Sequence, residues 1–164
     1  MKKSQYVTQS ALIAALYVVL TYVANIFGLA SGAVQLRLSE ALTVLPYFTP
    51  AAVPGLFVGC VLANLFTGGA LFDIIFGSIA TLLGAVFTRL LRKYKYLSPV
   101  PPIVFNTLIV PPILMFVYKA PGTYLYFTAT VFAGEVLSCG VLGIIVLKFL
   151  EKTKRFNIGN NDIS

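Results

Sequence analysis

The sequence contains no histidine, and only 10% of its 164 residues are charged. Without histidine, the chain lacks the Ser-His and Cys-His pairs, the zinc-binding HExxH motif and the usual proton shuttles of enzymes. It has no GxxxxGK[ST] phosphate loop, so it cannot hydrolyse ATP by that route. Its two cysteines, Cys60 and Cys139, lie in apolar runs and indicate neither a metal site nor a disulfide. We therefore expect a protein that is not an enzyme and has no cofactor.

The sequence consists largely of long apolar runs. Hydrophobic residues make up 59% of the chain, whereas soluble domains carry roughly 25% charged residues. This composition predicts an integral membrane protein. The run from Tyr6 to Leu29 follows a basic start, as in a signal peptide, but it is longer than the roughly 7–15 residues of a signal h-region. We therefore expect it to be retained as the first membrane span.

Apolar segments lie at residues 6–29, 41–49, 51–67, 71–91, 102–118 and 124–150. The second is too short to cross a bilayer alone, and prolines interrupt residues 41–67. This region could therefore form one broken span or two short ones. Two spans place ten basic residues on the cytoplasmic side and only Arg37 and Lys119 outside, as the positive-inside rule requires.

We therefore predict an all-α integral membrane protein of the cell membrane, with both termini in the cytoplasm. Residues 1–150 would form a bundle of six transmembrane helices with a structured first extracellular loop, and residues 151–164 a polar cytoplasmic tail. Residues 34–39 alternate apolar and polar side chains, which predicts a short extended segment in that loop. The net charge of +7 gathers at span ends, which indicates topology signals and contact with lipid headgroups rather than nucleic-acid binding.

Small residues recur at helical spacing and let helices approach closely in lipid. Most of these faces are expected to pack inside the bundle, but the face on the first helix could instead serve another subunit. The faces comprise Ala11, Ala14 and Ala15 on the first helix, Gly55, Gly59 and Ala63 on the third, and Gly77, Ala80 and Gly84 on the fourth.

Glu135 lies in the middle of the last apolar run, where a carboxylate costs about 2.5–3.5 kcal/mol if it faces lipid. Five further polar residues are placed by the topology in the outer half or near the middle of the bundle. Together the candidate substrate-binding residues are Arg37, Glu40, Asn64, Asp73, Asn106 and Glu135.

Most of these residues also have a structural explanation. Asp73 and Glu40 could complement helix dipoles, and Arg37 could pair with Glu40. The two asparagines could form hydrogen bonds between helices. Glu135 has the weakest such explanation, because no basic residue lies deep inside another span.

The convergence of these groups suits a small, planar, polar heterocycle that enters from outside. Tyrosines such as Tyr22, Tyr47, Tyr118, Tyr124 and Tyr126 are available for stacking. One carboxylate can accept both N–H groups of a guanine-like edge. Glu135 is therefore a candidate acceptor at the floor of the site.

The stretch from Arg37 to Pro46 (RLSEALTVLP), the stretch from Pro54 to Leu65 (PGLFVGCVLANL) and the Asp73 segment resemble the QueT family. The resemblance covers most of the chain, from about residue 5 to 150. That family consists of queuosine-precursor transporters that are substrate-binding (S) subunits of energy-coupling factor transporters.

The resemblance implies six helices, an extracellular-side pocket capped by the first loop, and a deazaguanine precursor of queuosine as substrate. It also implies a transmembrane T subunit and two cytoplasmic ATPase subunits as partners. Ala11, Ala14 and Ala15 match the helix face that docks on the T subunit.

Three functions compete. The preferred one is substrate capture for an ATP-driven importer, for a queuosine precursor or for another vitamin-like heterocycle. The second is a self-sufficient proton-coupled transporter that forms a homodimer and in which Glu135 binds the proton. The third is an intramembrane enzyme, which the lack of histidine and of any nucleophile–base motif disfavours.

Overall fold

The computed structural model describes residues 2–29, 36–119 and 121–153. Within them the chain is helical. The first helix, α1, spans Lys3–Ile26 and leads to a ten-residue 3₁₀ helix, η1, at Leu38–Tyr47. The remaining elements are α2 (Ala52–Phe66), a π-helical turn η2 (Asp73–Gly77), α3 (Ser78–Leu90), a 3₁₀ turn η3 (Lys95–Leu97), α4 (Val100–Phe116), α5 (Tyr124–Glu135), a π-helical segment η4 (Val136–Leu142) and α6 (Gly143–Lys152).

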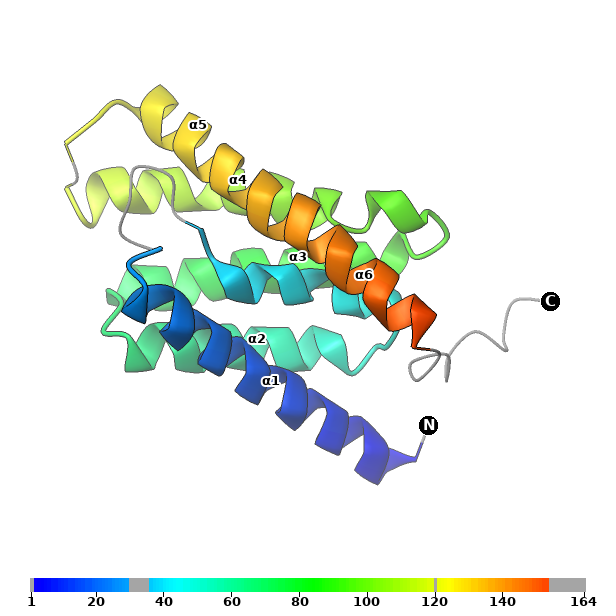
Figure 1. Cartoon of the computed structure of the whole chain (residues 1–164). Coiled ribbons are helices and arrows are strands. Elements are labelled where there is room, and N and C mark those ends of the chain that lie inside the picture. The colour runs from blue at the N-terminus through cyan, green and yellow to red at the C-terminus, as the bar shows by residue number, and fades with distance from the viewer. Residues whose placement is uncertain (1, 30–35, 120, 154–164) are drawn as a thin grey trace.

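The chain runs back and forth along one bundle, as Figure 1 shows. The successive passes are α1, η1, α2, α3, α4, and the continuous helix formed by α5, η4 and α6. The start of α1 and the end of α6 therefore lie at the same end. Four stretches are long and apolar enough to cross a membrane: Lys3–Ile26, Asp73–Leu90, Lys95–Phe116 and Tyr124–Lys152.

The two remaining passes are shorter. At about 2.0 Å per residue, the ten residues of η1 extend about 20 Å, and at 1.5 Å per residue the fifteen residues of α2 extend about 22 Å. A bilayer core is about 30 Å thick. The structure thus divides this region between two short helices, η1 and α2, and the crossing of the membrane by each of them stays a prediction.

The short helix η1 lies at the centre of the bundle. Every residue from Ser39 to Pro46 is buried, and η1 contacts α1, α2, α3, η4 and α6. Around it a core forms from Ile13, Tyr17, Leu42, Leu45, Leu56, Cys60 and Ala85. The Arg89 guanidinium donates to the carbonyl oxygens of Pro46 and Tyr47, at 3.2 and 3.3 Å, and so binds the C-terminal end of η1.

The extended segment predicted for residues 34–39 is only partly correct. Residues 34 and 35 lie outside the described part, as does most of the loop before them. Arg37 has extended backbone, but Leu38 already begins η1. The side chains of Ser39 and Glu40 therefore point into the core instead of alternating along a strand. Likewise, α6 continues through Glu151 to Lys152, and residues 154–164 of the predicted tail lie outside the described part.

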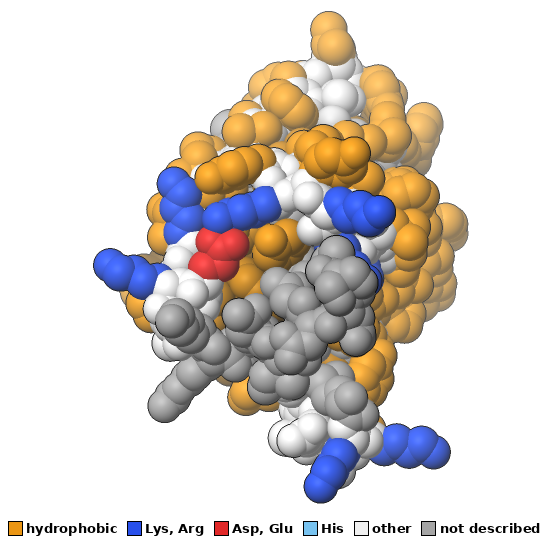
Figure 2. Space-filling view, turned by 90° about the vertical axis from the view of Figure 1, so that its right-hand side faces the viewer, with side chains coloured by type: hydrophobic (Ala, Val, Ile, Leu, Met, Phe, Trp, Pro, Cys, Tyr) orange, Lys and Arg blue, Asp and Glu red, His pale blue; other side chains and the backbone are white. Residues whose placement is uncertain are grey.

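Basic side chains gather at the end where α1 begins and α6 ends, which Figure 2 shows face on. An ion pair between Lys95 of η3 and Glu151 of α6 joins two of the passes there. The start of η1, which follows Arg37, and the end of α4, which shortly precedes Lys119, lie toward the opposite end of the bundle. The described residues thus keep the charge asymmetry that was read from the sequence.

The small residues on α2 pack against α1, as expected for faces inside the bundle. A Cβ atom added at Gly59 would lie 2.8 Å from Tyr17 Cβ and 3.0 Å from the Ala14 backbone. At Gly55 it would lie 2.7 Å from the Ser10 carbonyl oxygen. In the same way, Gly84 of α3 approaches the Pro102 backbone of α4. These glycines set the distance between neighbouring helices.

We expect the substitution Gly59→Ala to destabilise the fold, because the added methyl group has no space between α2 and α1. Overpacking of this kind costs about 1–3 kcal/mol. Thermal unfolding of the purified protein in detergent measures the loss. Gly140→Ala is the matched control, since an added Cβ there meets its nearest neighbours only at 3.8 Å. Equal melting temperatures for the two variants would contradict the close approach of α1 and α2.

Candidate functional site

A cavity of about 430 Å³ lies among the end of α1, the start of η1, the end of α2 and the end of α4. One wall is a stripe of α1 that carries Tyr17, Thr21 and Asn25 at successive i, i+4 positions. The other walls come from the start of η1, the end of α2 and the following loop, the start of η2, and the end of α4. Their lining residues are Arg37, Ser39, Asn64, Thr67, Gly68, Gly69, Asp73, Leu114 and Tyr118.

Two opposite charges line this cavity. Arg37, at the N-terminal end of η1, is half-buried. Burial lowers the pKa of its guanidinium, but the charges of Asp73, Tyr17 and Glu40 raise it more, so the net shift is upward. Arg37 therefore keeps its positive charge. Asp73 is the first residue of η2, and it is buried, because only 8% of its surface is exposed.

Asp73 is held in place by neighbouring polar groups. The Tyr118 hydroxyl donates to Asp73 Oδ2 at 3.2 Å and accepts from the Ala70 backbone N–H at 3.0 Å. Burial and the neighbouring Asp73 carboxylate raise the pKa of Tyr118 above its ordinary value. The Asn64 amide contacts the Asp73 carbonyl oxygen at 3.5 Å. The site thus offers a fixed carboxylate opposite a cation.

The floor of the cavity leads into a buried polar cluster. Tyr17 lines the cavity with only 2% of its surface exposed, and its hydroxyl donates to Glu40 Oε1 at 2.5 Å. Glu40 itself has no exposed surface. On its other side, the Asn106 amide nitrogen lies 3.5 Å from Glu40 Oε2.

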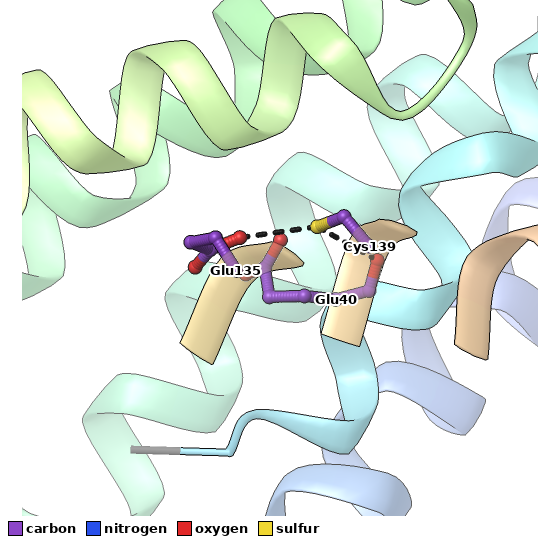
Figure 3. A group of neighbouring side chains, drawn as sticks. All are labelled: Glu40, Glu135 and Cys139. Carbon is purple, nitrogen blue, oxygen red and sulfur yellow. Dashed lines mark hydrogen bonds between the residues drawn. The ribbon is translucent and has the colours of Figure 1, made fainter. Parts of the chain in front are cut away.

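Glu135 is the last residue of α5, directly before η4, and lies close to Glu40 in the interior of the bundle. Figure 3 shows its side chain next to Glu40 and Cys139. The Cys139 thiol donates to Glu135 Oε2 at 3.0 Å. The Cys139 Sγ atom and one carboxylate oxygen of each glutamate all lie within 4.8 Å of one another. Both cysteines are free, in agreement with the expectation of no disulfide.

The six candidate residues therefore fall into two groups. Arg37, Asn64 and Asp73 line the cavity, whereas Glu40, Asn106 and Glu135 do not. Glu40 connects the groups through Tyr17. The expectation that Glu135 forms the cavity floor differs from this arrangement, because the side chains of Tyr17 and Glu40 occupy the space between.

Sequence reasoning missed the stripe on α1. Tyr17, Thr21 and Asn25 follow a helical spacing within an otherwise apolar run, so the signal was present. Of the tyrosines considered for stacking, Tyr118 lines the cavity. Tyr22 instead donates to the Phe66 carbonyl oxygen at 3.1 Å, and Tyr124 and Tyr126 are exposed on α5.

The three alanines of the small-residue face of α1 differ in their exposure. Ala14 is buried against Gly59 of α2, whereas Ala11 and Ala15 are exposed. Ala14 is thus part of the packing inside the bundle. A docking role for this face now concerns Ala11 and Ala15, and it stays a prediction.

The helices and the polar cavity define a multi-pass α-helical membrane protein. Residues 7–152 match the family model described as the QueT transporter, so the chain belongs to the QueT transporter family. The description of that family is of a transporter rather than of an enzyme.

A curated relative is the queuosine precursor transporter QueT of Lactococcus lactis subsp. cremoris (strain MG1363). It is 33% identical over 85 residues, which are 51% of this chain and 50% of that protein. The match thus spans about half the length of the relative. No solved structure matches the chain.

Proposed function

We propose that this chain is the substrate-binding (S) subunit of an energy-coupling factor importer. It captures a queuosine precursor of the deazaguanine type from outside the cell. It then delivers the precursor together with a transmembrane T subunit and two cytoplasmic ATPase subunits. The observation that carries this proposal is the polar cavity with Asp73 and Arg37 on its walls, in a chain of the QueT transporter family.

The chemistry of the cavity fits such a ligand. Its volume of about 430 Å³ lies within the roughly 300–1,000 Å³ of small-molecule sites. A carboxylate held by its neighbours, as Asp73 is, can accept the two adjacent N–H groups of a guanine-like edge. Arg37 and Asn64 offer N–H donors for the carbonyl and ring-nitrogen acceptors of the same heterocycle. The Lactococcus relative is named as a transporter of a queuosine precursor, which supports the same choice of substrate.

The orientation follows from charge. We place the basic end of the bundle in the cytoplasm of the cell, in accordance with the positive-inside rule. Both termini are then cytoplasmic, all six passes cross the membrane, and the cavity opens outward. A chain without a phosphate loop needs an external source of energy, which the ATPase subunits supply.

A ligand screen on the purified chain tests this proposal. In isothermal titration calorimetry we expect deazaguanine precursors of queuosine to bind with a Kd below about 1 μM, which corresponds to about −8.2 kcal/mol. Guanine is expected to bind more weakly, and riboflavin and thiamine not at all. Tight binding of a vitamin, without binding of any guanine-like compound, would assign the S subunit to another substrate.

The substitution Tyr118→Phe is expected to weaken ligand binding by about three- to tenfold. It removes the hydroxyl that holds Asp73 in place, and a hydrogen bond of this kind contributes about 0.5–1.5 kcal/mol. Titration calorimetry measures the change. Tyr126→Phe is the matched control, because Tyr126 is exposed and does not line the cavity. An equal loss in both variants would count against the role of Tyr118.

One observation favours a second candidate, the self-sufficient proton-coupled transporter. Glu135 is a buried carboxyl group beside a second one, Glu40, in the middle of the bundle. Intramembrane carboxyl groups in transporters often relay protons. The two candidates differ in whether a proton gradient drives uptake by this chain alone.

A further inference from the structure

Glu40 and Glu135 meet in the interior of the bundle, on segments far apart in the sequence. Only 0% and 5% of their surfaces are exposed. A carboxylate oxygen of each lies within 4.8 Å of the other, next to the Cys139 thiol (Figure 3). Neither the cavity lining nor the proposed ligand contacts use Glu135. The pair therefore needs an explanation of its own.

The donors around the pair do not compensate two negative charges. Glu40 accepts from Tyr17 and Asn106, and Glu135 accepts from the Cys139 thiol, which is a weak donor. In the part of the chain that the structure describes, the only ion pair within 4.0 Å is Lys95–Glu151 at the basic end. Two ionised carboxylates in such a place repel each other and lose their hydration, so one of them takes up a proton.

A second observation, which concerns an amide group and not the two acids, also indicates that a proton is bound at this place. Asn106 is 1% exposed, and its amide nitrogen faces Glu40. Its Oδ1 atom is buried and has no hydrogen-bond partner. Buried acceptors are nearly always paired. A carboxylic acid O–H beside Asn106 is a donor of the required kind, and Glu135 lies beside the same amide.

We propose that Glu40 and Glu135 form a proton-binding site whose occupancy is coupled to the ligand cavity. A proton from solvent binds to a carboxylate oxygen, an O–H bond forms, and the charge of the pair changes from −2 to −1. The proton reaches the pair from the cavity, where the Tyr17 hydroxyl already contacts Glu40. Release follows the same route in reverse.

Two residues of the cavity wall also interact with the acid pair, and they can couple proton binding to ligand binding. This coupling rests on the proposed function. Tyr17 lines the cavity and donates to Glu40. Arg37 lines the cavity and is attracted by Glu40. When the pair is fully ionised it holds Arg37 more strongly, in competition with the ligand. When the pair carries its proton, Arg37 is free to bind the ligand, so proton and ligand favour each other's binding.

Few other titratable groups face the pair. They are Cys139 on the same helix as Glu135, Tyr17 of α1, Cys60 of α2 and Arg37 before η1. From pH 6 to 9 arginine stays charged and tyrosine stays neutral, and a thiol, with an ordinary pKa of about 8.5, titrates only toward the upper end of that range. A pH response at this place is therefore assigned to the two glutamates.

Infrared spectroscopy of the purified chain without ligand tests the proton site itself. We expect the C=O stretch of a protonated carboxyl group at neutral pH, shifted in D₂O and lost in Glu135→Gln. Glu151→Gln, at the opposite end of the bundle, keeps the band. A wild-type spectrum that has only ionised carboxylates at neutral pH overturns the proposal, whether or not the variants fold.

The pH dependence of ligand binding tests the coupling. We expect the affinity of the wild-type chain for a deazaguanine precursor to fall as the pH rises from about 6 to 9, by at most about tenfold per unit for one proton. Glu135→Gln mimics the protonated form, so its affinity is expected to be independent of pH. A wild-type affinity that is equally independent of pH overturns the coupling. If no guanine-like compound binds, the proposed function fails, while the infrared spectrum still decides the proton site.

Discussion

Replacing Asp73 by asparagine is expected to weaken binding of the deazaguanine ligand by about tenfold to 150-fold. Asp73 is the buried carboxylate of the cavity wall, and Tyr118 holds it in place. Hydrogen bonds to charged groups contribute about 1.5–3 kcal/mol, and each 1.4 kcal/mol is a factor of ten. The amide also presents an N–H where the ligand needs an acceptor. Calorimetric titration of the two proteins measures the change.

Glu151→Gln is the matched control for this experiment. It makes the same change from carboxylate to amide, but at the basic end of the bundle, where Glu151 pairs with Lys95. Its affinity is expected to equal that of the wild type. If Asp73→Asn also binds like the wild type and remains folded, Asp73 is not the acceptor of the ligand's N–H edge. The proposed placement of the heterocycle would then be wrong.

Replacing Glu40 by alanine is expected to cost about 3–5 kcal/mol of stability, the largest effect on folding that the structure predicts. Glu40 is fully buried on η1, the helix at the centre of the bundle. The truncation leaves the Tyr17 hydroxyl and the Asn106 amide without their acceptor, and it opens a cavity in the core. Thermal unfolding in detergent is expected to show a much lower midpoint.

Glu40→Gln separates charge from hydrogen bonding. Glutamine keeps an acceptor for Tyr17 and fills the same space, so it is expected to be clearly more stable than the alanine variant. A double-mutant cycle of Glu40→Gln with Tyr17→Phe then isolates the 2.5 Å hydrogen bond. Additive effects in that cycle, or an alanine variant as stable as the wild type, would contradict a cluster held together through Glu40.

Much of the fold follows from patterns in the sequence. Apolar run lengths place the long helices, and the spacing of Gly55 and Gly59 predicts a closely packed face inside the bundle, which the structure places against α1. The position of η1 at the centre of the bundle does not follow from the sequence. Residues 41–49 are too few to span a bilayer alone, and the prolines within residues 41–67 left open one broken span or two short ones. The burial of η1 on all sides depends on the helices that surround it, and a local pattern does not contain that information.

The candidate site is divided for a related reason. Topology fixes how deep a residue lies, and it correctly placed Arg37, Asn64 and Asp73 at one end of the bundle. It does not fix how a helix is rotated about its axis. The π-helical segment η4 begins directly after Glu135, and Tyr17, which lines the cavity, contacts Glu40. Glu135, which the sequence suggested as the acceptor at the floor of the site, therefore lies in a buried pair with Glu40.

Uptake of a labelled deazaguanine precursor into proteoliposomes tests the central claim most directly. The chain is reconstituted alone, with a proton gradient imposed across the membrane, and in parallel with a T subunit, two ATPase subunits and ATP. We predict that the chain alone binds the precursor without accumulating it, and that uptake requires the partners and ATP. Gradient-driven accumulation by the chain alone would contradict the assignment as an S subunit and support the proton-coupled transporter.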